Sequence, residues 1–337
     1  MKTARRYLRP IAVIASTALF VCLLRRTGPA AILQNIRVLG WGIVALIVLS
    51  GIRQVLRALA WSYCMPTDGQ RPSALQLMGA RLVGEALNDL TPAGPLLGEP
   101  AKAVAASRLV PAQMAASSVV LENLIYALSA ILSVLTGVAL ALVAVAALRG
   151  FWWIGGGLMI GSVACLSIVC WAVSRRVLVL GRMLDSLKRC GWRWTFLERH
   201  ELAVRAVEQT VYDFFLKSRP TFLAVLAIEI ATNFTGVAEA CLILRAGTAH
   251  SSLFAAYLVE SASRAVQIAF SFVPLGLGVQ EGAAAATLQA VGYAASVGVS
   301  LAVIRKIRSL FWATVGLVFF AKYSILLPAA EKEHHLV

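Results

Sequence analysis

Long apolar runs restrict the fold of this chain more than any other feature of its sequence. The clearest lie at residues 40–61, 114–148, 151–173, 222–244 and 310–327. Shorter or more polar candidates lie at residues 11–24, 73–90 and 252–270. Crossing a hydrocarbon core takes about 20 apolar residues, and helices satisfy their own backbone groups in lipid. Only 14% of the residues are charged, against about 25% in a soluble domain. The sequence therefore predicts an all-α polytopic membrane protein with about eight transmembrane helices.

The run at residues 114–148 is too long for one straight span. It is interpreted either as two helices that meet in a tight turn near Thr136 and Gly137, or as one long tilted helix.

A polar interval at residues 175–219 divides the chain. It holds ten basic and five acidic residues, an excess that favours the cytoplasmic side of the membrane. The interval is interpreted as a cytoplasmic or interfacial connector between an N-terminal half, residues 1–174, and a C-terminal half, residues 220–327. A short polar tail, residues 328–337, completes a single membrane domain that spans the chain.

Positive charge sets the expected orientation. The N-terminus is basic, and a second basic pair, Arg25 and Arg26, follows the first apolar run. With no small-residue cleavage pattern, this run predicts a retained first helix with a cytoplasmic N-terminus. The net charge of +15 is attributed to loops facing anionic lipid, because no zinc-finger spacing or basic–aromatic module supports nucleic-acid binding.

One motif, P-x-G-x-x-x-x-E, occurs in both halves. Its matched pairs are Pro92 with Pro274, Gly94 with Gly276, and Glu99 with Glu281; the second copy also contains Gly278. Proline removes a backbone donor, glycine permits unusual dihedrals and glutamate is costly in hydrocarbon. Such segments are tolerated where they line a wet cavity, and paired interruptions indicate a transport site. We predict two broken or re-entrant elements related by an internal repeat, which the helix count leaves either parallel or inverted.

Polar residues surround the first motif. Helical spacing places four of them on one face: Arg81, Glu85, Asn88 and Asp89. This stripe is expected to face the bundle interior, because a charge at the bilayer centre costs about 2.5–3.5 kcal/mol. Glu99 and Lys102 follow. Since Glu99 precedes a proline, it is interpreted either as the acidic start of a helix or as a contact to a substrate headgroup, and the same alternatives apply to Glu281.

Other charges lie within apolar runs. Glu122 is the only charge between Arg108 and Arg149, so it requires a basic partner or a proton. Arg264, Arg305 and Arg308 are candidates for binding a phosphate, because guanidinium groups bind phosphate in a bidentate manner. The alternative is that basic residues pair with acids or extend to the membrane interface, and this alternative is favoured for Lys306 and Arg308. The buried-looking acids are Glu229, Glu239 and Glu260.

Four segments, in order, resemble one family. The string from Asn88 to Lys102 resembles the first signature of the flippase-like transmembrane domain of lysylphosphatidylglycerol synthases. Residues 119–124 resemble its glutamate-bearing helix, and residues 274–282 are similar to its second motif, P-x-G-x-G-x-x-E. Arg305 and the helix after it resemble the closing segment. One departure is Asn123, where many members carry arginine beside the glutamate.

The resemblance implies a bacterial cytoplasmic (inner) membrane domain that moves or binds a lipid. The expected substrate-binding residues are those of the two motifs and their polar surroundings: Arg81, Glu85, Asn88, Asp89, Pro92, Gly94, Glu99, Lys102, Glu122, Arg264, Pro274, Gly276, Gly278, Glu281 and Arg305. Only residues 328–337 follow the last predicted span, so the chain is not expected to make lysylphosphatidylglycerol by itself.

Two other functions are alternatives: an intramembrane lipid-modifying transferase or hydrolase, and a non-transporting partner of a lipid-synthesis enzyme. His200 and Glu201 begin like a zinc-protease motif, but Val204 breaks it. With no catalytic, metal-ligating or nucleotide-binding motif, the sequence predicts no enzyme, metal or cofactor. It does not indicate which lipid is moved, the direction, the energy source or the oligomeric state.

Overall fold

The computed structural model describes residues 40–65, 72–91, 94–144, 212–215, 218–248, 251–270, 273 and 276–325, with single positions between 156 and 209. All regular structure in these ranges is helical. The predicted first helix and the C-terminal tail lie outside the described residues, as do most of the connector and most of the predicted span at 151–173.

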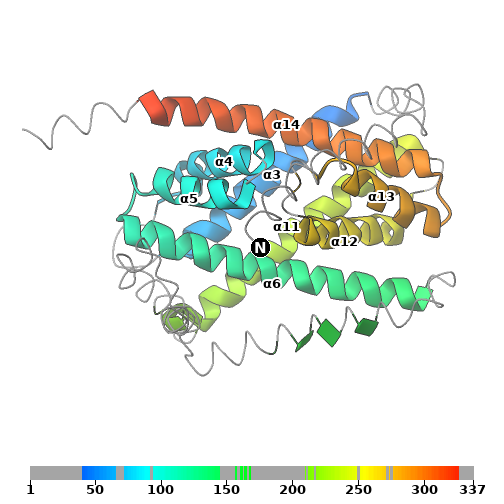
Figure 1. The fold of residues 1–337 in the computed structure, drawn as a ribbon, viewed down its shortest axis with the longest axis horizontal. Helices are drawn as coiled ribbons and strands as arrows, with labels where there is room; N and C mark the ends of the chain where they lie inside the picture. The colour runs from blue at the N-terminus through cyan, green and yellow to red at the C-terminus, as the bar shows by residue number, and fades with distance from the viewer. Residues whose placement is uncertain are drawn as a thin grey trace, which may run out of the picture.

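Each half contributes a long helix, two short helices and a second long helix (Figure 1). The N-terminal half contains α3 (Gly42–Tyr63), α4 (Ala74–Leu90), α5 (Gly94–Ala106) and α6 (Ala112–Ala144). The C-terminal half contains α11 (Arg219–Gly247), α12 (Leu253–Ala269), α13 (Val279–Ala290) and α14 (Ala295–Ile325).

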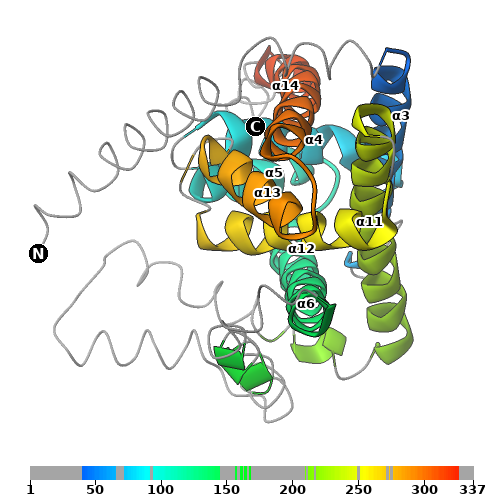
Figure 2. The same ribbon diagram turned by 90° about the vertical axis from the view of Figure 1, so that its right-hand side faces the viewer.

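The two halves interlock. Helix α4 packs against α14, and α12 packs against α6, so one short helix of each half lies on a long helix of the other half. In Figure 1, α6 and α14 lie on opposite sides of the molecule and run in opposite directions. Helices α3 and α11 lie side by side (Figure 2).

Three of the described helices are long and apolar enough to cross a membrane, namely α3, residues Ala112–Val143 of α6, and α11. These spans support a multi-pass membrane protein, while the number of eight stays a prediction. Helix α6 is continuous through Thr136 and Gly137, so the described part of the run, residues 114–144, forms one long helix without a turn at these residues.

Serine side chains fix the starts of α4 and α12. The Ser73 hydroxyl accepts from the backbone N–H of Gln76 at 3.4 Å, and the Gln76 side chain accepts from the backbone N–H of Ser73 at 2.8 Å. This reciprocal capping box satisfies donors that a helix leaves free. In α12, Ser252 accepts from the backbone N–H of Ala255 at 3.4 Å.

Glycines permit the close crossing of the two halves. A Cβ placed at Gly316 of α14 would lie 2.2 Å from the backbone oxygen of Leu82 in α4. A Cβ at Gly137 of α6 would lie 2.3 Å from Ser261 of α12. These two contacts hold α4 against α14 and α12 against α6, and polar residues of α4 and α12 line one shared cavity.

Gly316→Ala is expected to lower the stability of the protein by about 1–3 kcal/mol, the usual range for overpacking. The new methyl group meets a backbone oxygen, which cannot turn away as a side chain can. Thermal unfolding of the purified protein in detergent measures the effect. Gly247→Ala is the matched control, because a Cβ there meets nothing within 4 Å. Equal melting temperatures for the two variants would contradict the crossing at Gly316.

Candidate functional site

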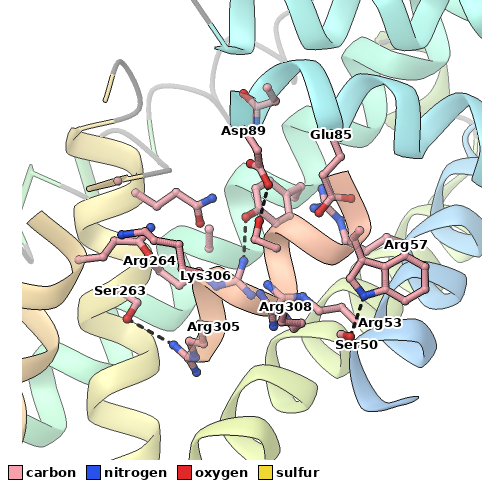
Figure 3. A pocket seen from close by; sticks show the side chains of 18 of the residues that line it. Ser50, Arg53, Arg57, Glu85, Asp89, Ser263, Arg264, Arg305, Lys306 and Arg308 are labelled. Atoms are coloured by element: carbon pink, nitrogen blue, oxygen red, sulfur yellow. Dashed lines mark hydrogen bonds between the residues drawn. The ribbon is translucent and has the colours of Figure 1, made fainter. Parts of the chain in front are cut away.

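A polar cavity of about 350 Å³ lies between the two halves. We call it the central cavity (Figure 3). Eight basic side chains line it: Arg53, Arg57, Arg81, Lys102, Arg264, Arg305, Lys306 and Arg308. Four acidic side chains line it as well: Glu85, Asp89, Glu99 and Glu260. Both halves contribute to each set.

Helix α4 supplies one wall through its polar face. Arg81 and Glu85 are one turn apart, with Nη2 and Oε2 separated by 4.0 Å. Gln54 of α3 bridges them, because its amide accepts from Arg81 Nε at 3.2 Å and donates to Glu85 Oε2 at 2.7 Å. One turn further, Asp89 accepts from Ser309 of α14. The stripe predicted from helical spacing therefore faces the cavity.

Glu122 is fully buried behind this wall. Its carboxylate accepts from Lys102, and from Arg81 Nη1 and Arg57 Nη2 at 3.2 Å each. The expectation that Glu122 needs a basic partner is confirmed. An ionised acid is tolerated in such an interior only when it is paired and hydrogen-bonded, so these three cations are anchored by one carboxylate.

Glu99 does not begin a helix, and this interpretation of the sequence was wrong. Helix α5 begins at Gly94 and contains Pro100 in its interior. A Cβ at Gly94 would lie 2.2 Å from the backbone oxygen of Asn88 in α4, so only glycine allows this approach. The Glu99 carboxylate instead accepts from Asn123 Nδ2 at 2.7 Å and lines the cavity.

In the opposite wall, two arginines converge on Glu260 from α12 and α14. Its carboxylate accepts from Arg264 Nε at 3.1 Å and from Arg305 Nη2 at 2.7 Å. Arg264 Nη1 also donates to the Tyr126 hydroxyl at 2.8 Å. Arg264 Nη2 and Arg305 Nε are buried and have no hydrogen-bond partner in the described part of the chain. One guanidinium nitrogen of each arginine therefore makes no hydrogen bond in the described residues.

The second motif holds an acid behind the cavity. Gly276 and Gly278 have φ of 57° and 78°, a region that favours glycine, and Gly278 immediately precedes α13. Glu281 lies in the first turn of α13, fully buried, and pairs with Lys306. The helix-start interpretation is confirmed for Glu281, where an acid complements the helix dipole. Arg308 likewise pairs with Glu239.

One comparison with known proteins identifies the family of the chain. A family model described as the lysylphosphatidylglycerol synthase TM region matches residues 10–316. The chain belongs to this family. No curated protein and no solved structure matched the chain. As a lysylphosphatidylglycerol synthase TM region, the protein is a membrane protein linked to lipid metabolism.

In this lysylphosphatidylglycerol synthase TM region, most of the predicted site residues meet at one place. The central cavity is lined by Arg81, Glu85, Asn88, Asp89, Glu99, Lys102, Arg264, Gly276 and Arg305. The predicted residues that do not line it are Glu122, Glu281, Gly94 and Gly278. Pro92 and Pro274 lie outside the described residues.

Helix α3 carries cavity residues that the sequence interpretation missed. Arg53 lies 3.6 Å from Glu239, measured between Nη1 and Oε2. The Arg57 guanidinium lies 4.2 Å from the ring centroid of Tyr126. Both arginines occur one turn apart at the end of an apolar run. That spacing was the available signal, since charges within membrane helices mark polar pathways.

Proposed function

We propose that this protein translocates a lipid between the two leaflets of the membrane by holding the polar headgroup in the central cavity. The acyl chains stay in the bilayer, so only the headgroup leaves water. The observation that carries the proposal is the cavity wall, in which eight basic and four acidic side chains from both halves meet. We place the protein in the bacterial cytoplasmic membrane with a cytoplasmic N-terminus.

The excess of basic groups on the wall favours a phosphate-bearing headgroup. Four more acids lie behind the wall rather than on it: Glu122, Glu229, Glu239 and Glu281. Glu122, Glu239 and Glu281 pair with lining cations from outside the cavity, so basic groups outnumber acidic groups on the wall itself. Arg264 and Arg305 line the cavity and suit a phosphate, because a guanidinium binds its oxygens through several N–H groups.

The acids of the cavity wall suit a second part of the headgroup, one that donates hydrogen bonds. Glu85 and Asp89 lie on the α4 side, whereas Arg264 and Arg305 project from α12 and α14 (Figure 3). Together with Glu99, they are placed to accept hydrogen bonds from an amine or hydroxyl of the same headgroup. The cavity would thus hold the phosphate at the C-terminal half and the polar substituent at the N-terminal half.

We infer further that the halves are an inverted repeat with two broken elements. Four pairs of matched positions share one separation along the chain (252 − 73 = 179): Ser73 with Ser252, Arg81 with Glu260, Glu85 with Arg264, and Gly137 with Gly316. The first pair caps α4 and α12, and the last forms the helix crossings. The opposite directions of α6 and α14 in Figure 1 favour an inverted over a parallel relation. Transporters built this way place their substrate between the repeats.

Glu99→Gln tests the proposal in proteoliposomes that contain fluorescent lipids. Wild-type protein is expected to move the lipid faster than protein-free vesicles do. The variant is expected to move it about 10- to 100-fold more slowly, because a hydrogen bond to a charged group contributes about 1.5–3 kcal/mol. Glu99→Asp keeps the charge and serves as the matched control. Movement no faster than in protein-free vesicles would overturn translocation, and an unchanged rate in Glu99→Gln would exclude Glu99 from it.

A further inference from the structure

Glu229 of α11 is a buried acid that lies outside the central cavity. Its side chain is fully buried and does not line the central cavity. Neither carboxylate oxygen has a hydrogen-bond partner among the described residues. A single ion-pair contact is present there, at 4.0 Å between Oε2 and Arg57 Nε. Arg57 Nε is likewise buried and makes no hydrogen bond.

The other buried acids are compensated. Glu122 accepts from three basic side chains and Glu260 from two. Glu239 pairs with Arg308, and Glu281 pairs with Lys306. An ionised carboxylate that lacks hydrogen bonds in a dry interior is strongly disfavoured and takes up a proton instead. Glu229 therefore differs from these acids, because its surroundings favour the neutral, protonated form of the carboxyl group.

Arg57 joins Glu229 to the cavity. Its guanidinium lines the central cavity and donates to Glu122 at 3.2 Å through Nη2, while Nε faces Glu229. One cation is thus shared by two buried acids and is also within reach of a headgroup. Any movement of Arg57 toward the cavity weakens its contact with Glu229.

The surroundings of Glu229 come from several helices. The charged and titratable groups that act on it are Arg57 and Cys64 of the α3 region, Arg81 of α4, Glu122 and Tyr126 of α6, and Arg264 of α12. Helix α14 presents two charges to α11: Arg308 pairs with Glu239, and Arg305 donates to the backbone oxygen of Gly236 at 3.0 Å. Both contacts lie about two turns or more from Glu229. Of these groups, Arg57 makes the direct contact with the Glu229 carboxylate.

We propose that Glu229 is a proton-binding site whose occupancy is coupled, through Arg57, to the headgroup in the central cavity. This inference rests on the proposed function. When an anionic headgroup holds Arg57 in the cavity, a carboxylate oxygen of Glu229 binds a proton that enters from water. When the headgroup leaves, Arg57 turns to Glu229, the O–H bond breaks and the proton returns to water. Because coupling is reciprocal, acidic conditions strengthen headgroup binding.

The first test concerns the proton alone. Infrared spectroscopy of the purified protein at mildly acidic pH, where the site holds its proton without a headgroup, is expected to show the carbonyl band of a protonated carboxyl group. The band should disappear in Glu229→Gln and persist in Glu99→Gln, which removes a half-exposed acid. Glutamine has the shape of a protonated glutamate, so Glu229→Gln is expected to fold. A wild-type protein without this band, or a band unchanged in Glu229→Gln, would overturn the proton site.

The second test concerns the coupling. Vesicles of phosphatidylcholine with a fluorescent phosphatidylglycerol tracer are given a pH difference across the membrane. The wild-type rate of tracer movement is expected to change severalfold with the direction of the gradient, and the Glu229→Gln rate is expected not to respond. A wild-type rate that ignores the gradient would overturn the coupling alone. A wild-type protein that moves no lipid would overturn the proposed function, while the infrared result still decides the proton site.

Discussion

Glu122→Gln is expected to destabilise the protein by about 3–5 kcal/mol, the usual cost of removing one partner from a buried ion pair. The carboxylate is fully buried and accepts from Lys102, Arg81 and Arg57. Glutamine keeps the size of the side chain but removes the charge, so three cations lose their shared anion. Denaturant or thermal unfolding in detergent measures the loss.

Glu99→Gln is the matched control for stability. The Glu99 side chain is 39% exposed and lies 3.7 Å from Lys102, so its loss is expected to cost no more than about 1 kcal/mol. Adding Lys102→Met to Glu122→Gln should recover part of the stability, because it removes one uncompensated charge. Glu122→Gln protein as stable as the wild type would show that the three cations do not depend on this carboxylate.

The interior polar residues were predictable where a local rule applies. Helical spacing identified the stripe that contains Arg81 and Glu85, and the cost of a lone charge in an apolar run required a partner for Glu122. The pairing of Lys306 and Arg308 with acids follows from the same cost. These predictions succeed because a hydrocarbon surrounding penalises every unpaired charge in the same way, whatever the fold.

The choice of partners was not predictable, because it depends on how distant helices cross. Arg53 and Arg57 close an apolar run, a position typical of the membrane interface. Arg53 contacts Glu239, and Arg57 contacts Glu229. Both acids belong to α11, and only the packing of α3 against α11 brings these pairs together. The cavity is thus assembled by tertiary packing rather than by either motif alone.

Glycine and proline misled the sequence interpretation for a related reason. Gly137 permitted a turn, but it serves the close contact of α6 with Ser261. Pro100 indicated the first turn of a helix, yet α5 begins at Gly94, where glycine allows contact with Asn88. A glycine that permits a turn and one that permits close packing look the same in sequence.

Arg264→Gln and Arg305→Gln are each expected to slow the movement of a phosphate-bearing lipid by at least about tenfold. Each substitution removes a guanidinium that lines the cavity, and losing a charge-assisted hydrogen bond to the phosphate costs about 1.5–3 kcal/mol. Glu260 accepts from both arginines, so either variant leaves this acid with one cation. Initial rates with a fluorescent phosphatidylglycerol in proteoliposomes measure the effect. Arg245→Gln is the matched control, because Arg245 is exposed at the end of α11 and bonds to Ser251 outside the cavity.

Measurement with a lipid that lacks phosphate distinguishes lost phosphate recognition from damage to the fold. If Arg264 and Arg305 hold a phosphate, their substitution should slow a fluorescent phosphatidylglycerol and leave the residual movement of an uncharged glycolipid unchanged. Lysine at either position keeps the positive charge but lacks the planar fork of donors, so Arg305→Lys should recover only part of the rate. An equal loss for both lipids would assign the two arginines to packing around Glu260. The phosphate would then have to meet the other basic groups of the cavity.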